Sequence, residues 1–199
     1  FSPGLFHDIV KSEVLRGSRL VLVDVDQDKG QQMRELAAKM NDSANTDLSI
    51  EFTHDRLEAL EGADFVINAV SVGRLESWKK DIDIPARYGI HQHQGEEAGP
   101  GGFAHSLRQI PIVLEICRDV ERLCPQALFL NFSNPMMRVC DAIHRYTKVR
   151  FVGLCHGLAH YLRQLEVKFG WDAGSLQALA GGINHCTWVK KLTFAEDGR

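Results

Sequence analysis

Apolar residues along this chain fall into two alternating patterns, one typical of strands and one typical of helices. Short apolar runs predict strands at 19–24, 48–52, 63–70, 127–132 and 149–155. Between them, apolar positions recur every three or four residues, which predicts helices at 3–16, 27–41, 78–88, 103–124, 135–146 and 158–169. Strands alternating with helices indicate an α/β fold with a doubly wound, mostly parallel sheet.

Three of these segments carry more detailed expectations. The strand at 63–70 is apolar enough to be covered on both faces, and the strand at 19–24 is expected to be buried. Residues 176–194 are expected to form two strands that meet at Gly181 and Gly182. The helix at 103–124 is expected to be bent at Pro111 and to bury one stripe: Phe103, Leu107, Ile110, Leu114, Cys117 and Cys124.

The order of elements suggests a particular variant of this fold. A Rossmann-like domain begins with a strand, a glycine-rich turn and a helix. Here a helix comes first, and the first predicted strand ends in Asp24. We therefore expect residues 1–155 to form a Rossmann-like, dinucleotide-binding domain without its first strand and glycine-rich turn. Residues 156–199 would then be the start of a C-terminal domain, and both ends are expected to be truncated.

Composition and charge exclude several classes of partner. The 199 residues are 44% hydrophobic and 25% charged, with a net charge of −3, so neither a nucleic acid nor an anionic membrane is an expected partner. No apolar run approaches the roughly 20 residues that cross a bilayer. The five cysteines include no CxxC pair, and Cys117 and Cys124 would lie roughly 10 Å apart on a helix, too far for a disulfide. Free thiols and a cytoplasmic location are expected.

Polar residues at strand ends are the candidates for cofactor binding. Asp24 ends a strand, where an acid can accept hydrogen bonds from the two hydroxyls of an adenosine ribose. The alternative is a surface acid that caps the next helix together with Asp26. The loop from Val70 to Gly73 follows another strand, and Gly73 would let a ligand approach the backbone closely. A plain connecting loop is the alternative.

Two further segments allow both a structural and a functional interpretation. The glycine-rich stretch 95–102 leads into a helix whose N-terminus would attract an anionic group, or it is an ordinary surface loop. Asn134 either caps the helix that begins at Pro135 or faces the crevice and bonds a sugar hydroxyl, and one residue can do both.

A cysteine and a histidine near strand ends are candidate metal ligands. Cys155 ends the strand at 149–155, and His185 lies thirty residues further on. Neighbouring side chains on a strand face opposite ways, so Cys155 is paired with His185 and His156 is left beside the site. A thiolate and an imidazole can share a divalent metal, and their softness favours zinc. A buried structural thiol with a hydrogen-bonded histidine is the alternative.

Taken together, these segments resemble glycoside hydrolase family 4. The matching segments occur in the family's order over essentially the whole chain: LVDVD at 22–26, FVIN at 65–68, GPGG at 99–102, LRQIP at 107–111, NFSNP at 131–135, GLCHG at 153–157 and GINH at 182–185. The family is an exception to the scheme of two catalytic carboxylates.

The resemblance implies a redox mechanism for glycoside hydrolysis. NAD would oxidise the sugar at C3, a base would remove the acidified C2 proton, the C1 substituent would be eliminated, water would add, and the hydride would return. A divalent metal, typically manganese, would bind the C2 and C3 oxygens. The family's tyrosine base would lie beyond this chain, because Tyr88, Tyr146 and Tyr161 are not at its expected place.

The resemblance also implies roles for individual residues. Cys155 and His185 would hold the metal, and Asn134 would contact the sugar. His156 would be an acid–base residue near the leaving group. The NAD-binding residues would be Asp24, Asn68 and Val70.

Two departures from the family pattern bear on the substrate. Members acting on 6-phospho-sugars often have Arg in place of Ser71 and Asn in place of His156, so an unphosphorylated α-glycoside is expected. A homodimer or homotetramer is expected as well. The alternatives are an NAD-dependent 2-hydroxyacid dehydrogenase of the lactate/malate type, and a non-catalytic nucleotide-binding fragment. The 199 residues by themselves are expected to be inactive.

Overall fold

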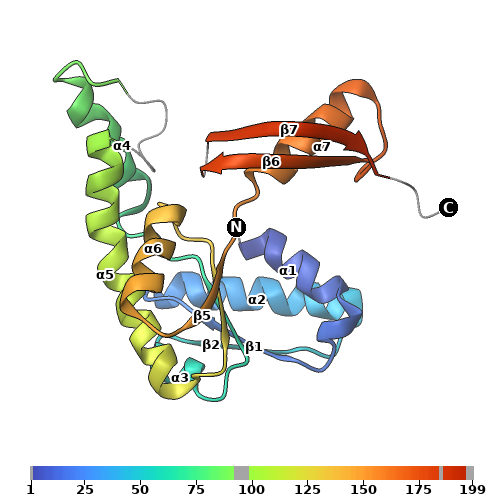
Figure 1. Cartoon of the computed structure of the whole chain (residues 1–199). Coiled ribbons are helices and arrows are strands. Elements are labelled where there is room, and N and C mark those ends of the chain that lie inside the picture. Colours follow the sequence, from blue (N-terminus) through green and yellow to red (C-terminus); the bar gives the residue numbers. More distant parts are fainter. Residues whose placement is uncertain (1, 92–98, 184–185, 196–199) are drawn as a thin grey trace. The chain divides into compact units, whose positions relative to one another are not determined.

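A computed structural model describes residues 2–91, 99–183 and 186–195 of the chain (Figure 1). The chain divides into two compact units. Unit 1 consists of Phe1–Asp64 and Asp119–Ala127, and unit 2 of Phe65–Arg118 and Leu128–Arg199. Each unit contains parallel strands joined by helices, which confirms the predicted α/β class.

Unit 1 is built on two parallel strands. Its elements are α1 (Ser2–Lys11), a short 3-10 helix (Glu13–Leu15), β1 (Arg19–Val23), α2 (Gln27–Ala44), β2 (Ser49–Thr53) and α3 (Arg56–Leu60). Helices α1 and α2 pack together (Figure 1), and the packing of α2 on β2 depends on Gly30. A Cβ on Gly30 would lie 2.0 Å from the ring of Phe52, so a side chain here would force that ring to shift.

A charged cluster joins α3 to the end of α5 within unit 1. Arg56 Nε donates to Asp119 Oδ2 at 2.8 Å, and Arg122 donates to Asp119 Oδ1 at 3.1 Å. Burial acts to raise the pKa of Asp119, but the hydrogen bonds from Arg56 and Arg122 hold it below its ordinary value.

Unit 2 is built on three parallel strands in the order β3-β4-β5 and an antiparallel pair, β6-β7. Its elements are β3 (Phe65–Asn68), α4 (Arg74–Ala86), α5 (Gly99–Leu123, which continues into unit 1), β4 (Leu128–Asn131), α6 (Met136–Tyr146), β5 (Arg150–Gly153), α7 (Gly157–Phe169), β6 (Leu176–Ile183) and β7 (Cys186–Phe194). Helix α4 is tied to α5 because Arg108 donates two N–H groups to the buried carboxylate of Asp81, which raises the pKa of Arg108.

The antiparallel pair is attached to α7 by one buried carboxylate. Glu166, in α7, accepts a hydrogen bond from the N–H of Leu176 at 3.1 Å, at the start of β6. Aromatic contacts also link these elements, because Trp171 stacks on Phe169 and meets Phe194 edge-on. Leu176 and Glu166 are buried, whereas the three aromatic residues are exposed.

Several sequence predictions were wrong in detail. β3 is not covered on both faces, because it is an edge strand whose exposure alternates and Phe65 is 64% exposed. β1 is half-buried rather than buried. Gly181 and Gly182 do not end the first strand of the pair: they lie within β6 and pair with Trp188 and Thr187. Helix α3 was not predicted, and α4 and α5 each begin four residues earlier than expected.

The predicted stripe of α5 was wrong in its first half. Phe103 is 62% and Leu107 61% exposed, while the polar side chain of Gln109 is fully buried. Further along, Val113, Cys117 and Cys124 are buried, as an apolar stripe requires. The first turns of α5 therefore bury a different, more polar face than periodicity predicts.

Two general expectations can be compared with the structure. Cys117, Cys124, Cys140 and Cys155 form no disulfide bond, and burial raises the pKa of the Cys124 thiol. Of the helices that the structure describes, none is both long enough and apolar enough to span a bilayer.

Candidate functional site

The carboxyl ends of the three parallel strands in unit 2 lie in one row. Asn68 of β3 is in register with Asn131 of β4, which is in register with Gly153 of β5. The row continues one step further, since Phe132 N–H donates to Asn68 O at 2.8 Å and Leu154 N–H donates to Asn131 O at 2.9 Å. The loops after these strands therefore leave from one sheet edge, which carries Val70, Asn134, Cys155 and His156.

Asn68 lies inside a buried polar network at this edge. Its Nδ2 donates to Asn131 Oδ1 at 2.8 Å and to Ser133 Oγ at 3.1 Å. Its Oδ1 is buried and has no hydrogen-bond partner among the described residues. Because an unpaired buried acceptor is costly, this oxygen is the atom of Asn68 that a ligand or a water would satisfy.

The loop after β3 is held by side chains from two other elements. The carbonyl oxygen of Val70 accepts hydrogen bonds from Gln109 Nε2 and from Ser133 Oγ, the latter at 2.7 Å. The N–H of Val72 donates to Gln109 Oε1 at 3.1 Å. The last residue of the loop, Gly73, and the first residue of α4, Arg74, both have a positive φ, at 70° and 45°. A non-glycine residue rarely adopts such a φ, so the surrounding contacts impose a specific path here.

Asn134 was predicted, as one of two roles, to cap α6, but Pro135 is the N-cap residue of this helix, and no side-chain capping bond forms there. The Oδ1 of Asn134 accepts a hydrogen bond from Met136 N–H at 3.3 Å, at the start of α6, and the side chain is half-buried. The Asn134–Pro135 peptide is cis. The hydrogen bond from Met136 N–H uses only the side-chain oxygen of Asn134, which leaves the amide nitrogen as a donor for a ligand.

Cys155 lies in the exposed turn between β5 and α7. Its Sγ accepts from Gly157 N–H at 3.4 Å, so the alternative of a buried structural thiol was wrong. His156 is also exposed and precedes the first residue of α7, with its ring centroid 6.2 Å from that of His160. His185, the second predicted metal ligand, lies outside the described residues. Within the described part of the chain, no three His, Cys, Asp or Glu side chains form a metal-binding group.

Asp24 lies in unit 1, directly after β1. Its Oδ1 accepts from Asp26 N–H at 2.9 Å, and the residue is half-buried. Asp26, rather than Asp24, caps α2 by accepting from Lys29 N–H at 3.1 Å. The capping role proposed as an alternative for this segment therefore belongs to Asp26, and the second carboxylate oxygen of Asp24 is available for a ligand.

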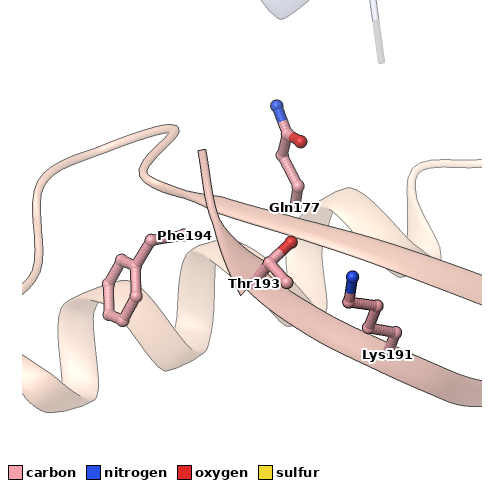
Figure 2. Close-up of a pocket in the computed structure, with 4 residues that line it drawn as sticks. All are labelled: Gln177, Lys191, Thr193 and Phe194. Atoms are coloured by element: carbon pink, nitrogen blue, oxygen red, sulfur yellow. The ribbon is translucent and has the colours of Figure 1, made fainter. Parts of the chain in front are cut away.

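An open hollow of about 570 Å³ lies elsewhere, on the β6-β7 pair (Figure 2). Gln177 of β6 and Lys191, Thr193 and Phe194 of β7 line it. None of these residues was predicted to belong to a site, and the sheet edge described above contributes none of them.

Sequence reasoning missed two residues of the site, Gln109 and Ser133. Ser133 lies within the quoted NFSNP segment, but it was given no role. Gln109 likewise lies within the quoted LRQIP segment and was given no role. Its pairing with the loop after β3 is visible only in the fold.

The fold defines the chain as a Rossmann-like α/β protein, a class whose ligand crevices lie at the carboxyl ends of parallel strands. The model of the family 4 glycosyl hydrolases matches residues 1–168, and the chain belongs to this family.

Individual relatives agree with this assignment. The chain is 38% identical over 201 residues to an alpha-glucosidase of Erwinia rhapontici, covering 100% of this chain and 44% of that protein. It is 35% identical over 199 residues to an alpha-galactosidase of Bacillus subtilis, covering 100% and 46%. A solved 6-phospho-alpha-glucosidase from gut microorganisms, in complex with NAD and Mn²⁺, has a TM-score of 0.86 at 25% identity and covers 99% and 45%. The chain thus spans about half the length of the relatives it matches.

Proposed function

We propose that the complete protein hydrolyses O-glycosidic bonds with the help of NAD and a divalent metal. The observation that carries the proposal is the common sheet edge of unit 2. In this family member, the segments with Val70, Asn134, Cys155 and His156 all leave from that edge. Relatives described as an alpha-glucosidase and an alpha-galactosidase, and a structure that holds NAD and Mn²⁺, support the same activity.

The residues that we propose for NAD binding are Asp24 in unit 1 and Asn68 and Val70 in unit 2. Asp24 follows β1 and has a carboxylate oxygen for a ribose hydroxyl. The loop from Val70 to Gly73 holds a fixed backbone path, and Asn68 has an unpaired buried oxygen. NAD, when bound, supplies reversible hydride transfer, whereas the protein supplies binding and orientation.

The proposed metal ligands are Cys155 and His185. Cys155 presents an exposed sulfur at the sheet edge. A divalent ion held there would polarise neighbouring sugar oxygens. Asn134 would orient the sugar through its amide nitrogen, and the exposed ring of His156 would transfer a proton at the leaving group. In this proposal residues 156–199 begin the substrate and metal domain, with residues 1–155 forming the NAD-binding domain.

The substrate that we propose is an unphosphorylated α-glycoside. Ser71 is neutral, small and exposed at the sheet edge, so it offers no positive charge for a sugar phosphate. His156 directly follows Cys155, the proposed metal ligand, at the position where members acting on 6-phospho-sugars often have Asn. We also propose that the protein forms a homodimer or homotetramer and works in the cytoplasm.

The decisive experiment assays the protein from its complete reading frame on nitrophenyl α- and β-glycosides, with and without a 6-phosphate. We expect turnover of unphosphorylated α-glycosides that needs both NAD and Mn²⁺ and is abolished by EDTA, because neither the redox step nor the polarisation can then occur. Hydrolysis that continues without NAD and with EDTA would refute the proposal. A 2-hydroxyacid dehydrogenase would instead oxidise lactate or malate and ignore the chelator.

A further inference from the structure

The side chain of Gln109 makes an unusual pair of contacts for a residue in the middle of a long helix. It belongs to α5 and is fully buried. Both ends of its carboxamide are used by a single loop, since Nε2 donates to Val70 O and Oε1 accepts from Val72 N–H at 3.1 Å. A buried amide needs partners for both its donor and its acceptor, and this loop supplies one of each.

The arrangement leaves the residue between the two anchored positions exposed. Val70 and Val72 are half-buried, whereas Ser71 is exposed at the sheet edge. Val70 O is held a second time by Ser133 Oγ, and Ser133 itself accepts from Asn68 Nδ2. The loop path is thus fixed from two sides, by α5 and by the segment after β4.

From these contacts we propose that Gln109 is a positioning residue for cofactor binding. It holds the loop from Val70 to Gly73 in the shape that receives the dinucleotide and does not touch the ligand itself. This inference rests on the proposed function, because it assumes that the loop contacts NAD. A preformed loop lowers the ordering cost of binding, so loss of the clamp weakens NAD binding.

Gln109→Met and Gln109→Glu, which nearly keep the size of the side chain, test this role in the protein from its complete reading frame. Gln109→Met fills the space without hydrogen bonds, and we expect it to raise the Kd for NAD by about tenfold or more. The KM for the glycoside at saturating NAD should change by less than about twofold. Hydrogen exchange of a peptide covering residues 69–75 should become faster, because the Val72 N–H loses its acceptor. The exposed Gln31→Met on α2 is the matched control and should change none of these values.

Gln109→Glu adds a pH signature that a purely structural role would not produce. As a carboxylate, the new side chain would face the Val70 carbonyl oxygen without a proton to donate. Burial favours its neutral form, and the neutral acid donates to that carbonyl as the amide does. We expect the ratio of its NAD Kd to the wild-type value to fall by about fivefold or more between about pH 8 and about pH 5.5.

The possible outcomes separate this inference from the proposed function. Tight NAD binding by the wild type and by Gln109→Met alike would overturn the role of Gln109 alone. The role would also be overturned if the ratio of the NAD Kd of Gln109→Glu to the wild-type Kd did not change with pH. A wild-type protein that binds no NAD would overturn the proposed function and the cofactor role together, while hydrogen exchange would still show whether Gln109 holds the loop.

Discussion

Single residues set the geometry of the sheet edge by their size as much as by their polarity. Gly153 is the last residue of β5, two positions before Cys155. A Cβ on Gly153 would lie 2.5 Å from Cys140 Sγ and 2.7 Å from Met136 Sδ, both in α6. A side chain at Gly153 would therefore force Cys140 or Met136 of α6 to shift, just as a side chain at Gly30 would force Phe52 of β2 to shift.

Gly153→Ala should destabilise the protein by about 1–3 kcal/mol, since its methyl group would overpack the contact with α6. Chemical denaturation with urea measures the change in the free energy of unfolding. Gly181→Ala in β6 is the control, because a Cβ there meets no atom within 4 Å. Equal stability of the two variants would contradict the steric argument.

At the scale of elements, buried polar side chains attach helices to their neighbours. Gln109 joins α5 to the loop after β3, Asp81 joins α4 to α5, and Glu166 joins α7 to β6. Each of these groups is buried, so each would be costly without its partner. Such contacts specify one arrangement of the elements, whereas apolar contacts tolerate several.

The pH dependence of stability should reveal the role of Glu166. Burial acts to raise its pKa, but the N–H groups of Leu176 and Gly174 and the side chain of Arg163 hold it below its ordinary value of 4.5. A carboxylate with a lowered pKa in the folded state contributes stability above its ordinary pKa and loses it as the pH falls through the lowered value.

Glu166→Gln should therefore lower the Tm near pH 7, and the Tm difference from the wild type should shrink as the pH falls below 4.5. Thermal unfolding followed by circular dichroism over this pH range measures the difference. For Glu61→Gln, at an exposed position, the free energy of unfolding should stay within about 0.5 kcal/mol of the wild-type value throughout. A Tm difference for Glu166→Gln that is constant with pH would contradict the argument.

At the scale of the whole molecule, the proposed activity needs residues from distant parts of the sequence. The sheet edge of unit 2 collects side chains from the loops that follow three strands, while Asp24 belongs to unit 1. The chain covers about half of its relatives' length, so the proposed activity is tested on the complete protein.

The complete protein should also show its proposed assembly directly. We expect light scattering coupled to gel filtration to give the mass of a homodimer or homotetramer at micromolar concentration. Dilution should leave that mass unchanged if the assembly is stable, because a stable interface commonly buries more than about 1,000 Å². A monomer at every concentration would contradict the proposed assembly and leave the proposed chemistry unaffected.

Periodicity and strand-end residues by themselves determined the α/β class, the alternation of most helices and strands, and the family. These features are local: apolar spacing reports which face of a helix or strand is buried, and parallel strands place their carboxyl ends together. For the same reason the segments with Val70, Asn134 and Cys155 could be assigned to one sheet edge before their register was known. His185 remains a prediction, because it lies outside the described residues.

Only the tertiary structure decided which face of α5 is buried and which residue holds the loop after β3. Periodicity favoured Phe103 and Leu107, yet the helix buries Gln109, because the peptide groups of Val70 and Val72 need hydrogen-bond partners there. Likewise, the exposure of Phe65 follows from the edge position of β3, and a side chain at Gly153 would force side chains of α6 to shift. Each of these depends on a neighbour distant in sequence, and apolar spacing within one segment carries no information about that neighbour.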